Sequence, residues 1–220
     1  MKKLVGDSLD EIQKFLKSKI QELDVVVMPD YFLDRIISLN WNMKRFSEKL
    51  EKVAKRKGGS IDGIEQTELR GGNAINTASA LAALGVKVIP VACTNKLGLE
   101  LIKFYLKPFR VDLSHIKILH KLSTTTAIEF KTENGKVNVM LRDVGALADF
   151  GTHHLSGDDF DTFEKADYIC IFNWAGTRRF GTELAMTVFH YAKTKGKGKT
   201  YYDTADPIPN KGKIPELVKS

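Results

Sequence analysis

Short apolar runs alternate along this chain with longer stretches in which apolar residues recur every third or fourth position. The runs are rich in Val and Ile, which is typical of buried strands, and the periodic stretches are typical of helices that bury one face. Strands are predicted at 24–28, 86–92, 116–119, 168–172 and 200–202, and helices at 8–23, 42–57, 73–85, 98–106 and 178–195. Because strands and helices alternate, the pattern predicts a doubly wound α/β fold with a mostly parallel sheet.

One part of the chain breaks this alternation. Residues 124–131 and 136–142 have the pattern of two strands, and the Glu-Asn-Gly between them is a strong signal for a tight turn. We therefore expect an antiparallel hairpin, which forms a small added sheet with the segment 60–70. The chain is predicted to comprise an N-terminal helical extension at 1–23 and an α/β domain at 24–220.

The segment 71–85 is the most informative, because Gly71 and Gly72 open a predicted helix that continues with Asn73 and Asn76. Glycines leave the first N–H groups of the helix unencumbered, and the positive end of the helix dipole suits an oxygen-rich ligand. Asn73 and Asn76 are three residues apart and lie on one face, where each offers a donor and an acceptor to a sugar hydroxyl. The alternative is a core helix that begins at glycine and uses Asn as its N-cap.

Polar residues follow several of the predicted parallel strands. Asp30 and Asp34 follow the first strand, Asn95 follows the next, Asn173 follows the strand at 168–172, and Asp203 follows the last. The carboxyl ends of parallel strands form the edge at which α/β folds bind ligands. These side chains are therefore expected to converge on one site.

Composition narrows the class of partner. The formal net charge is +7, and much of it comes from basic runs at 55–57 and 193–199, which lie at the ends of predicted helices. Because no aromatic residues are interleaved with these runs, a solvated surface is favoured over a nucleic-acid site. The longest apolar runs have the length of strands, so no membrane partner is expected.

Cysteine and histidine usage gives two further expectations. Cys93 and Cys170 both lie in apolar runs, which favours buried thiols and a reducing, cytoplasmic location. His153 and His154 are adjacent and show no zinc-type spacing, so no metal site is predicted around them.

Several segments together resemble the ribokinase-like (PfkB) carbohydrate kinase family. They are Val-Val-Val-Met-Pro-Asp-Tyr-Phe-Leu-Asp at 25–34, the Gly-Gly-Asn-Ala-x-Asn helix at 71–76, the Gly-Val-x-Val strand from Gly85, the hairpin, and the Gly-Ala that follows it at 145–146. They occur in the order typical of that family, over roughly residues 24–205. The resemblance implies a ribokinase-like fold in which the hairpin serves as a β lid.

The resemblance also implies roles for individual residues. Asp34 would hold two sugar hydroxyls, although a role as a turn or cap residue is the alternative. The other implied substrate-binding residues are Gly71, Gly72, Asn73, Asn76, Arg142 and Asn173. ATP and Mg²⁺ are implied as the cofactors of the family, and a homodimer formed through the lid is an expected partner.

This sequence departs from the family pattern in two ways. Pro29 stands where the family has Gly at the end of the opening strand. The sequence contains neither the Asn-x-x-Glu segment nor the Gly-Ala-Gly-Asp helix start that supplies the catalytic base; the Gly-Ala-Leu-Ala-Asp at 145–149 follows the lid and is not that base. No catalytic residue is therefore expected in this chain, and its residues do not themselves support ATP or Mg²⁺ binding.

The expected function is that of the acceptor-binding portion of a kinase that acts on a sugar, sugar acid or nucleoside. A piece of a longer kinase and a shortened paralogue both fit this expectation. The alternative function is a catalytically inactive module that binds a sugar or nucleoside.

Overall fold

The computed structural model of the chain describes residues 11–12, 14–15, 22–109 and 111–219. The helix predicted at 8–23 therefore lies mostly outside the described residues. The described strands are β1 Asp24–Met28, β2 Phe32–Ser38, β3 Glu65–Gly71, β4 Lys87–Pro90, β5 Cys93–Thr94, β6 Lys117–Ile118, β7 Ser123–Thr132, β8 Gly135–Asp143, β9 Tyr168–Ile171 and β10 Lys199–Tyr202. The described α-helices are α2 Met43–Lys55, α3 Asn73–Ala83, α4 Lys96–Leu106, α5 Gly157–Lys165, α6 Gly181–Lys195 and α7 Ile214–Lys219. Short 3-10 helices span Gly145–Asp149, Thr152–His154 and Ile208–Lys213.

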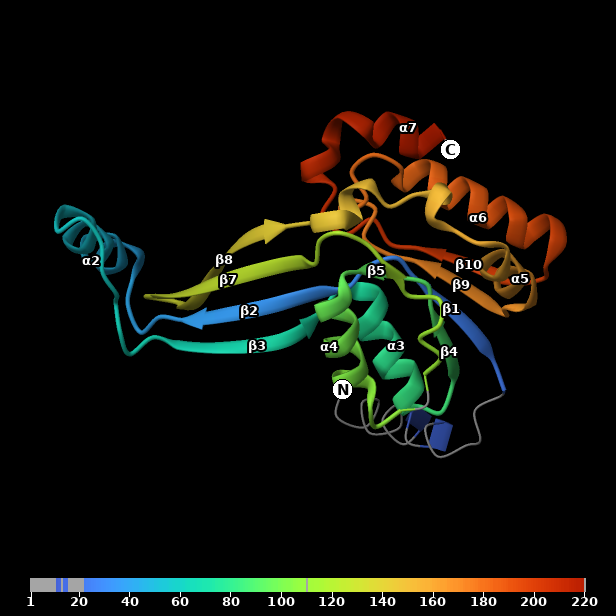
Figure 1. Ribbon diagram of the computed structural model, residues 1–220, viewed down its shortest axis with the longest axis horizontal. Coiled ribbons are helices and arrows are strands. Elements are labelled where there is room, and N and C mark those ends of the chain that lie inside the picture. Colours follow the sequence, from blue (N-terminus) through green and yellow to red (C-terminus); the bar gives the residue numbers. More distant parts are fainter. Residues whose placement is uncertain (1–10, 13, 16–21, 110, 220) are drawn as a thin grey trace.

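The main sheet contains β10, β9, β1 and β4 in that order, and each neighbouring pair is parallel. Helices cover both of its faces, with α3 and α4 on one side and α5, α6 and α7 on the other (Figure 1). This arrangement confirms the predicted doubly wound α/β fold.

The apolar run of β1 is explained by burial on both faces of the main sheet. Val26 and Met28 pack into the cluster that includes Phe163 of α5, whereas Val25 and Val27 pack with α3 on the opposite face. Successive strand residues point to opposite faces, so a strand covered on both sides is apolar throughout.

A second sheet, which contains the hairpin expected to serve as a lid, projects from the main body (Figure 1). We call it the lid sheet; its strand order is β3, β2, β7 and β8. β2 is antiparallel to β3 and parallel to β7, and β7 and β8 form the antiparallel hairpin. Helix α2 lies at the far end of this sheet, away from the main sheet (Figure 1). Strands β7 and β8 lie where the hairpin was expected, and β3 overlaps the segment 60–70, whereas β2 was not predicted as a strand.

Asp30 connects the end of β1 to two other elements. Its carboxylate accepts hydrogen bonds from the backbone N–H of Asn73 (3.0 Å) and of Ala74 (2.8 Å) at the start of α3. It also accepts one from Nδ2 of Asn173, just after β9 (2.9 Å). Gly72, the N-cap of α3, has no side chain to satisfy these donors, so Asp30 caps the helix from another strand.

Replacing Asp30 by Asn tests this connection. Asp30 is only 1% exposed, and an amide in its place directs an NH₂ group at a backbone or side-chain donor. A buried donor left without an acceptor costs about 1–3 kcal/mol, so Asp30→Asn is expected to lower the free energy of unfolding in urea by about 2 kcal/mol.

Asp161→Asn is the matched control, because Asp161 is exposed on α5. It is expected to change the free energy of unfolding by less than about 0.5 kcal/mol. Equal stability of the two variants would show that Asp30 does not hold the three elements together.

Candidate functional site

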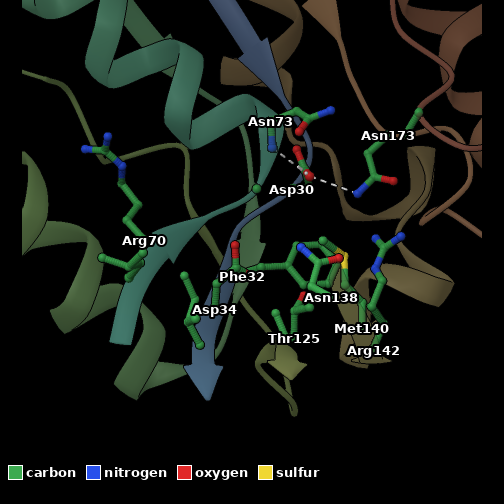
Figure 2. A pocket seen from close by; sticks show the side chains of 15 residues that line it. Asp30, Phe32, Asp34, Arg70, Asn73, Thr125, Asn138, Met140, Arg142 and Asn173 are labelled. Atoms are coloured by element: carbon green, nitrogen blue, oxygen red, sulfur yellow. Dashed lines mark hydrogen bonds between the residues drawn. The ribbon is translucent and has the colours of Figure 1, made fainter. Parts of the chain in front are cut away.

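A pocket of ≈ 330 Å³ lies between the lid sheet and the carboxyl-terminal edge of the main sheet. Figure 2 shows Asp30, Asn73 and Asn173 on one side of it and the lid residues on the other. We call it the lid pocket; its lining residues include Phe32, Asp34, Leu69, Thr125, Asn138, Met140 and Arg142 from the lid, and Asp30, Gly72, Asn73 and Asn173 from the main domain. Its size is at the lower end of the range for small-molecule sites.

The register of the lid sheet places Asp34 in this pocket. Asp34 pairs with Leu69 on β3 and with Thr125 on β7, and all three side chains line the pocket. Burial raises the pKa of Asp34, while a hydrogen bond with Thr125 and the charge of Arg142 oppose the increase. Asp34 is thus a half-buried carboxyl group that faces a ligand-sized space.

The Asp34 carboxylate occupies space beside Gly71 that is free because glycine has no side chain. A Cβ at Gly71 would lie 2.2 Å from Oδ2 of Asp34, which is far inside van der Waals contact. Gly72 has φ +90°, and a Cβ there would lie 2.8 Å from the backbone oxygen of Asp30. Both glycines therefore allow the start of α3 to approach the chain that leaves β1.

The expectation that the first N–H groups of this helix are unencumbered is wrong. The N–H groups of Asn73 and Ala74 already donate to Asp30. A ligand in the pocket therefore meets side chains and not a free helix N-terminus. The sequence carries one signal of this contact: a helix that begins at glycine has no side chain at its N-cap, so another element must supply the acceptor.

The structure separates Asn73 from Asn76. Asn73 lines the pocket, and its Nδ2 donates to Oδ2 of Asp203 (2.8 Å). Asn76 lies outside the pocket lining, and its Oδ1 accepts from Nε of Arg70 (2.9 Å). The helix period puts both residues on one face, but Arg70 occupies the space in front of Asn76.

Asn173 has an unusual environment for a polar residue. It is 3% exposed and lines the pocket, and its backbone lies in the left-handed region at φ 56°. Its Nδ2 donates to Asp30, and among the described residues its Oδ1 has no hydrogen-bond partner. A buried acceptor without a donor is costly, so this atom is available to a hydroxyl or N–H group of a ligand.

The hairpin contributes four pocket residues that were not predicted from the sequence: Thr125, Ala127, Asn138 and Met140. They come from β7 and β8, whose pocket-facing side follows from pairing with β2. Alternation within each strand indicates two faces, but only the long-range pairing shows which face meets the ligand. Arg142, which was predicted, belongs to the same face.

Metal and membrane features can be stated only for the described residues. Among them, no group of three or more His, Cys, Asp or Glu residues is arranged to hold a metal ion. None of the helices in the part of the chain that the structure describes is long and apolar enough to cross a bilayer.

The sequence matches the pfkB family of carbohydrate kinases over residues 38–220, and the chain belongs to this family. The match begins after Asp34, so the family assignment does not depend on that carboxylate. No curated protein matches the sequence.

Solved structures of sugar kinases have the same fold. A probable sugar kinase protein from Rhizobium etli has a TM-score of 0.65 at 16% identity, with 91% of this chain and 61% of that chain covered. A fructokinase with bound ATP from Xylella fastidiosa has a TM-score of 0.62 at 14% identity, with 86% and 54% covered. A ribokinase from Arabidopsis thaliana, complexed with ribose and ATP, has a TM-score of 0.60 at 15% identity, with 84% and 54% covered. This chain thus spans little more than half the length of these proteins, and the likeness establishes the fold.

The close approach of Gly71 and Asp34 makes a testable prediction. Gly71→Ala places a methyl group against the Asp34 carboxylate. Overpacking of this kind costs about 1–3 kcal/mol, and we expect that loss in the free energy of unfolding. Because the clash is with one side chain, the double variant Gly71→Ala/Asp34→Ala is expected to recover most of the loss.

Gly157→Ala is the control, since a Cβ at Gly157 in α5 meets nothing within 4 Å. It is expected to preserve or slightly raise stability in urea denaturation. A Gly71→Ala loss that persists unchanged in the double variant would mean that the clash lies elsewhere.

Proposed function

We propose that this chain binds the alcohol acceptor of a carbohydrate kinase: a sugar, sugar acid or nucleoside whose hydroxyl receives a phosphoryl group from ATP. The observation that carries the proposal is the presence of two hydrogen-bond acceptors in one pocket, the Asp34 carboxylate and the buried Oδ1 of Asn173. Both groups accept hydrogen bonds, and a polyol offers several hydroxyl donors on a small carbon frame.

Asp34 would carry most of the recognition. Hydrogen bonds from hydroxyls to an ionised carboxylate are stronger than bonds between neutral groups. A ligand that lacks the hydroxyls would leave the half-buried carboxylate without partners, so such a site discriminates strongly against it. The lid would also exclude water from the bound hydroxyl.

This proposal includes ATP and Mg²⁺ because they are implied as the cofactors of the carbohydrate kinase family. When bound, they supply the phosphoryl group and neutralise its charge during transfer. The described residues contribute the acceptor side of the reaction, and the proposal assigns them no catalytic base. A phosphoryl-transfer assay with the ligands that bind distinguishes this function from the alternative, a non-catalytic module that binds a polyol in the same pocket.

Replacing Asp34 by Asn is expected to weaken polyol binding by about 10- to 100-fold, because the variant keeps the shape of the side chain and loses its charge. Isothermal calorimetry with a panel of pentoses, hexoses, sugar acids and nucleosides measures the effect. In the parent, affinity is expected to fall as the pH drops through the pKa of Asp34. Since burial raises this pKa, the fall begins above the ordinary value of 3.8.

Glu68→Gln is the matched control, because Glu68 lies on the neighbouring strand β3 and pairs with Arg35, outside the pocket. It is expected to bind the same ligands with unchanged affinity. If Asp34→Asn binds the preferred ligand as tightly as the parent does, Asp34 is not a hydroxyl-binding residue.

We also propose that the lid sheet pairs with that of a second copy of this chain. On β8, Val137, Val139 and Leu141 point away from the pocket and are 42–58% exposed. Val139 continues a row of apolar residues with Ile37 and Ile128 across three strands. A contiguous exposed apolar surface of this kind favours association.

Val139→Lys tests the dimer. The parent is expected to sediment as a dimer in analytical ultracentrifugation and the variant as a monomer, because a lysine would be buried in the apolar contact without a partner. Ile208→Lys is the control, since Ile208 is 71% exposed and lies outside the lid sheet. A monomeric parent would refute the proposal.

A further inference from the structure

Arg142 is a charged group without a carboxylate partner in the lid pocket. Its guanidinium lies over the ring of Phe32, 5.1 Å from the centroid, and it forms no ion pair with any described residue. A cation–π contact holds the side chain in place but leaves its N–H donors free. In Figure 2 the Arg142 side chain points toward Asn173 across the pocket.

The register of the lid sheet fixes the separation between Arg142 and Asp34. Thr125 pairs with Asp34 on one side and with Arg142 on the other, so the two charged residues lie two strands apart in one row. Two strand spacings correspond to about 10 Å between backbones, and both side chains extend from the same face. The row therefore offers a negative and a positive group to opposite ends of one small ligand.

A second guanidinium reinforces the positive end. Arg178, in the segment after β9, donates to the neutral side chain of Asn210 (3.0 Å) and is not ion-paired to a described carboxylate. Burial lowers the pKa of Arg178, and the nearby charge of Arg142 lowers it further. The ammonium of Lys213 donates to the backbone carbonyl oxygens of Arg178 and Arg179.

The other charged groups of the pocket do not neutralise the positive charge of Arg142. Arg70 is held by Asn76 and Ser79 at the other side, and the Asp30 carboxylate is saturated by three donors. Asp34 faces the pocket but lies two strands away from Arg142. A guanidinium in the pocket that forms no ion pair with a described residue is suited to a carboxylate or phosphate of a ligand.

We propose that the acceptor bound in the lid pocket is an anionic polyol, a carboxylate or phosphate ester, whose hydroxyls are held by Asp34 and whose anionic group is held by Arg142. This inference rests on the proposed function and narrows its substrate class. Arg142 is then the residue that selects anionic over neutral polyols, and Arg178 adds to the attraction.

Matched ligand pairs test the inference by calorimetry on the full chain. Gluconate, ribonate and galactonate are each compared with the corresponding alditol, and ribose 5-phosphate with ribose; acetate and inorganic phosphate supply the anion without the polyol. The carboxylate and phosphate arms distinguish the two anionic groups. In at least one pair, the anionic member is expected to bind tenfold or more tightly than the neutral member.

The variants assign this preference to one side chain. Arg142→Gln is expected to reduce the preference to about onefold and to change the affinity of the neutral member less than about twofold, whereas Arg142→Lys keeps part of the preference. Arg35→Gln is the matched control, since Arg35 lies on β2 of the same sheet, paired with Glu68 and outside the pocket. It is expected to behave like the parent, and thermal melting of each variant verifies that it is folded.

The possible failures are distinct. Equal affinity for both members of every pair, or an Arg142→Gln variant that weakens both members equally, overturns the inference. If Asp34→Asn still weakens binding by about 10- to 100-fold, the proposed function stands. Acetate or phosphate binding as tightly as the anionic polyol, with no effect of Asp34→Asn, overturns both, as does a panel in which no ligand binds.

Discussion

The geometry of the site depends on the buried carboxylate of Asp30. It accepts two backbone N–H groups of α3 and the side-chain amide of Asn173, so it joins the ends of β1 and β9 to the start of a helix. Burial raises the pKa of Asp30, and these three bonds oppose the increase because they favour the ionised form. The same contacts orient the Asn173 amide, since Nδ2 donates to Asp30 and Oδ1 is left for the pocket. An interaction that secures the fold thus also determines which atom a ligand meets.

The lid contributes through its register. Asp34, Thr125 and Arg142 occupy one row although they lie far apart in the sequence, and a shift of one residue on β2 or β8 would turn a charged side chain to the outer face. Within the lid sheet, the Asp34 carboxylate on β2 fills the space that a Cβ at Gly71 on β3 would need. A side chain at Gly71 would therefore displace the carboxylate from that row.

Local sequence signals predicted most of the strands and helices, because buried strands are apolar and helices carry a periodic face, but they missed β2, which contains Asp34. The family match and the fold of the solved kinases confirm the ribokinase-like class. Asp34 was named through the resemblance to the kinase family, and Gly71 through the glycine pair that opens the predicted helix. The saturation of the first N–H groups of α3 could not be predicted in this way, because it depends on Asp30, 43 residues away from Asn73. The position of Asn76 depends on Arg70, and that of Thr125 on the pairing of β2 with β7, so neither follows from local periodicity.

The hydrogen bonds of Asp30 also determine which charged groups of the pocket remain available to a ligand. Asp30 directs its oxygens to the donors of α3 and Asn173, so it offers little to a ligand even though it lies at the pocket wall. The available charges are then Asp34 and Arg142, and the charge of Arg142 opposes the increase that burial causes in the pKa of Asp34. A neutral polyol would engage only the negative end and would leave Arg142 against the Phe32 ring. A polyol with an anionic group satisfies both ends at once, and its orientation is fixed, because reversing it would place like charges together at Asp34.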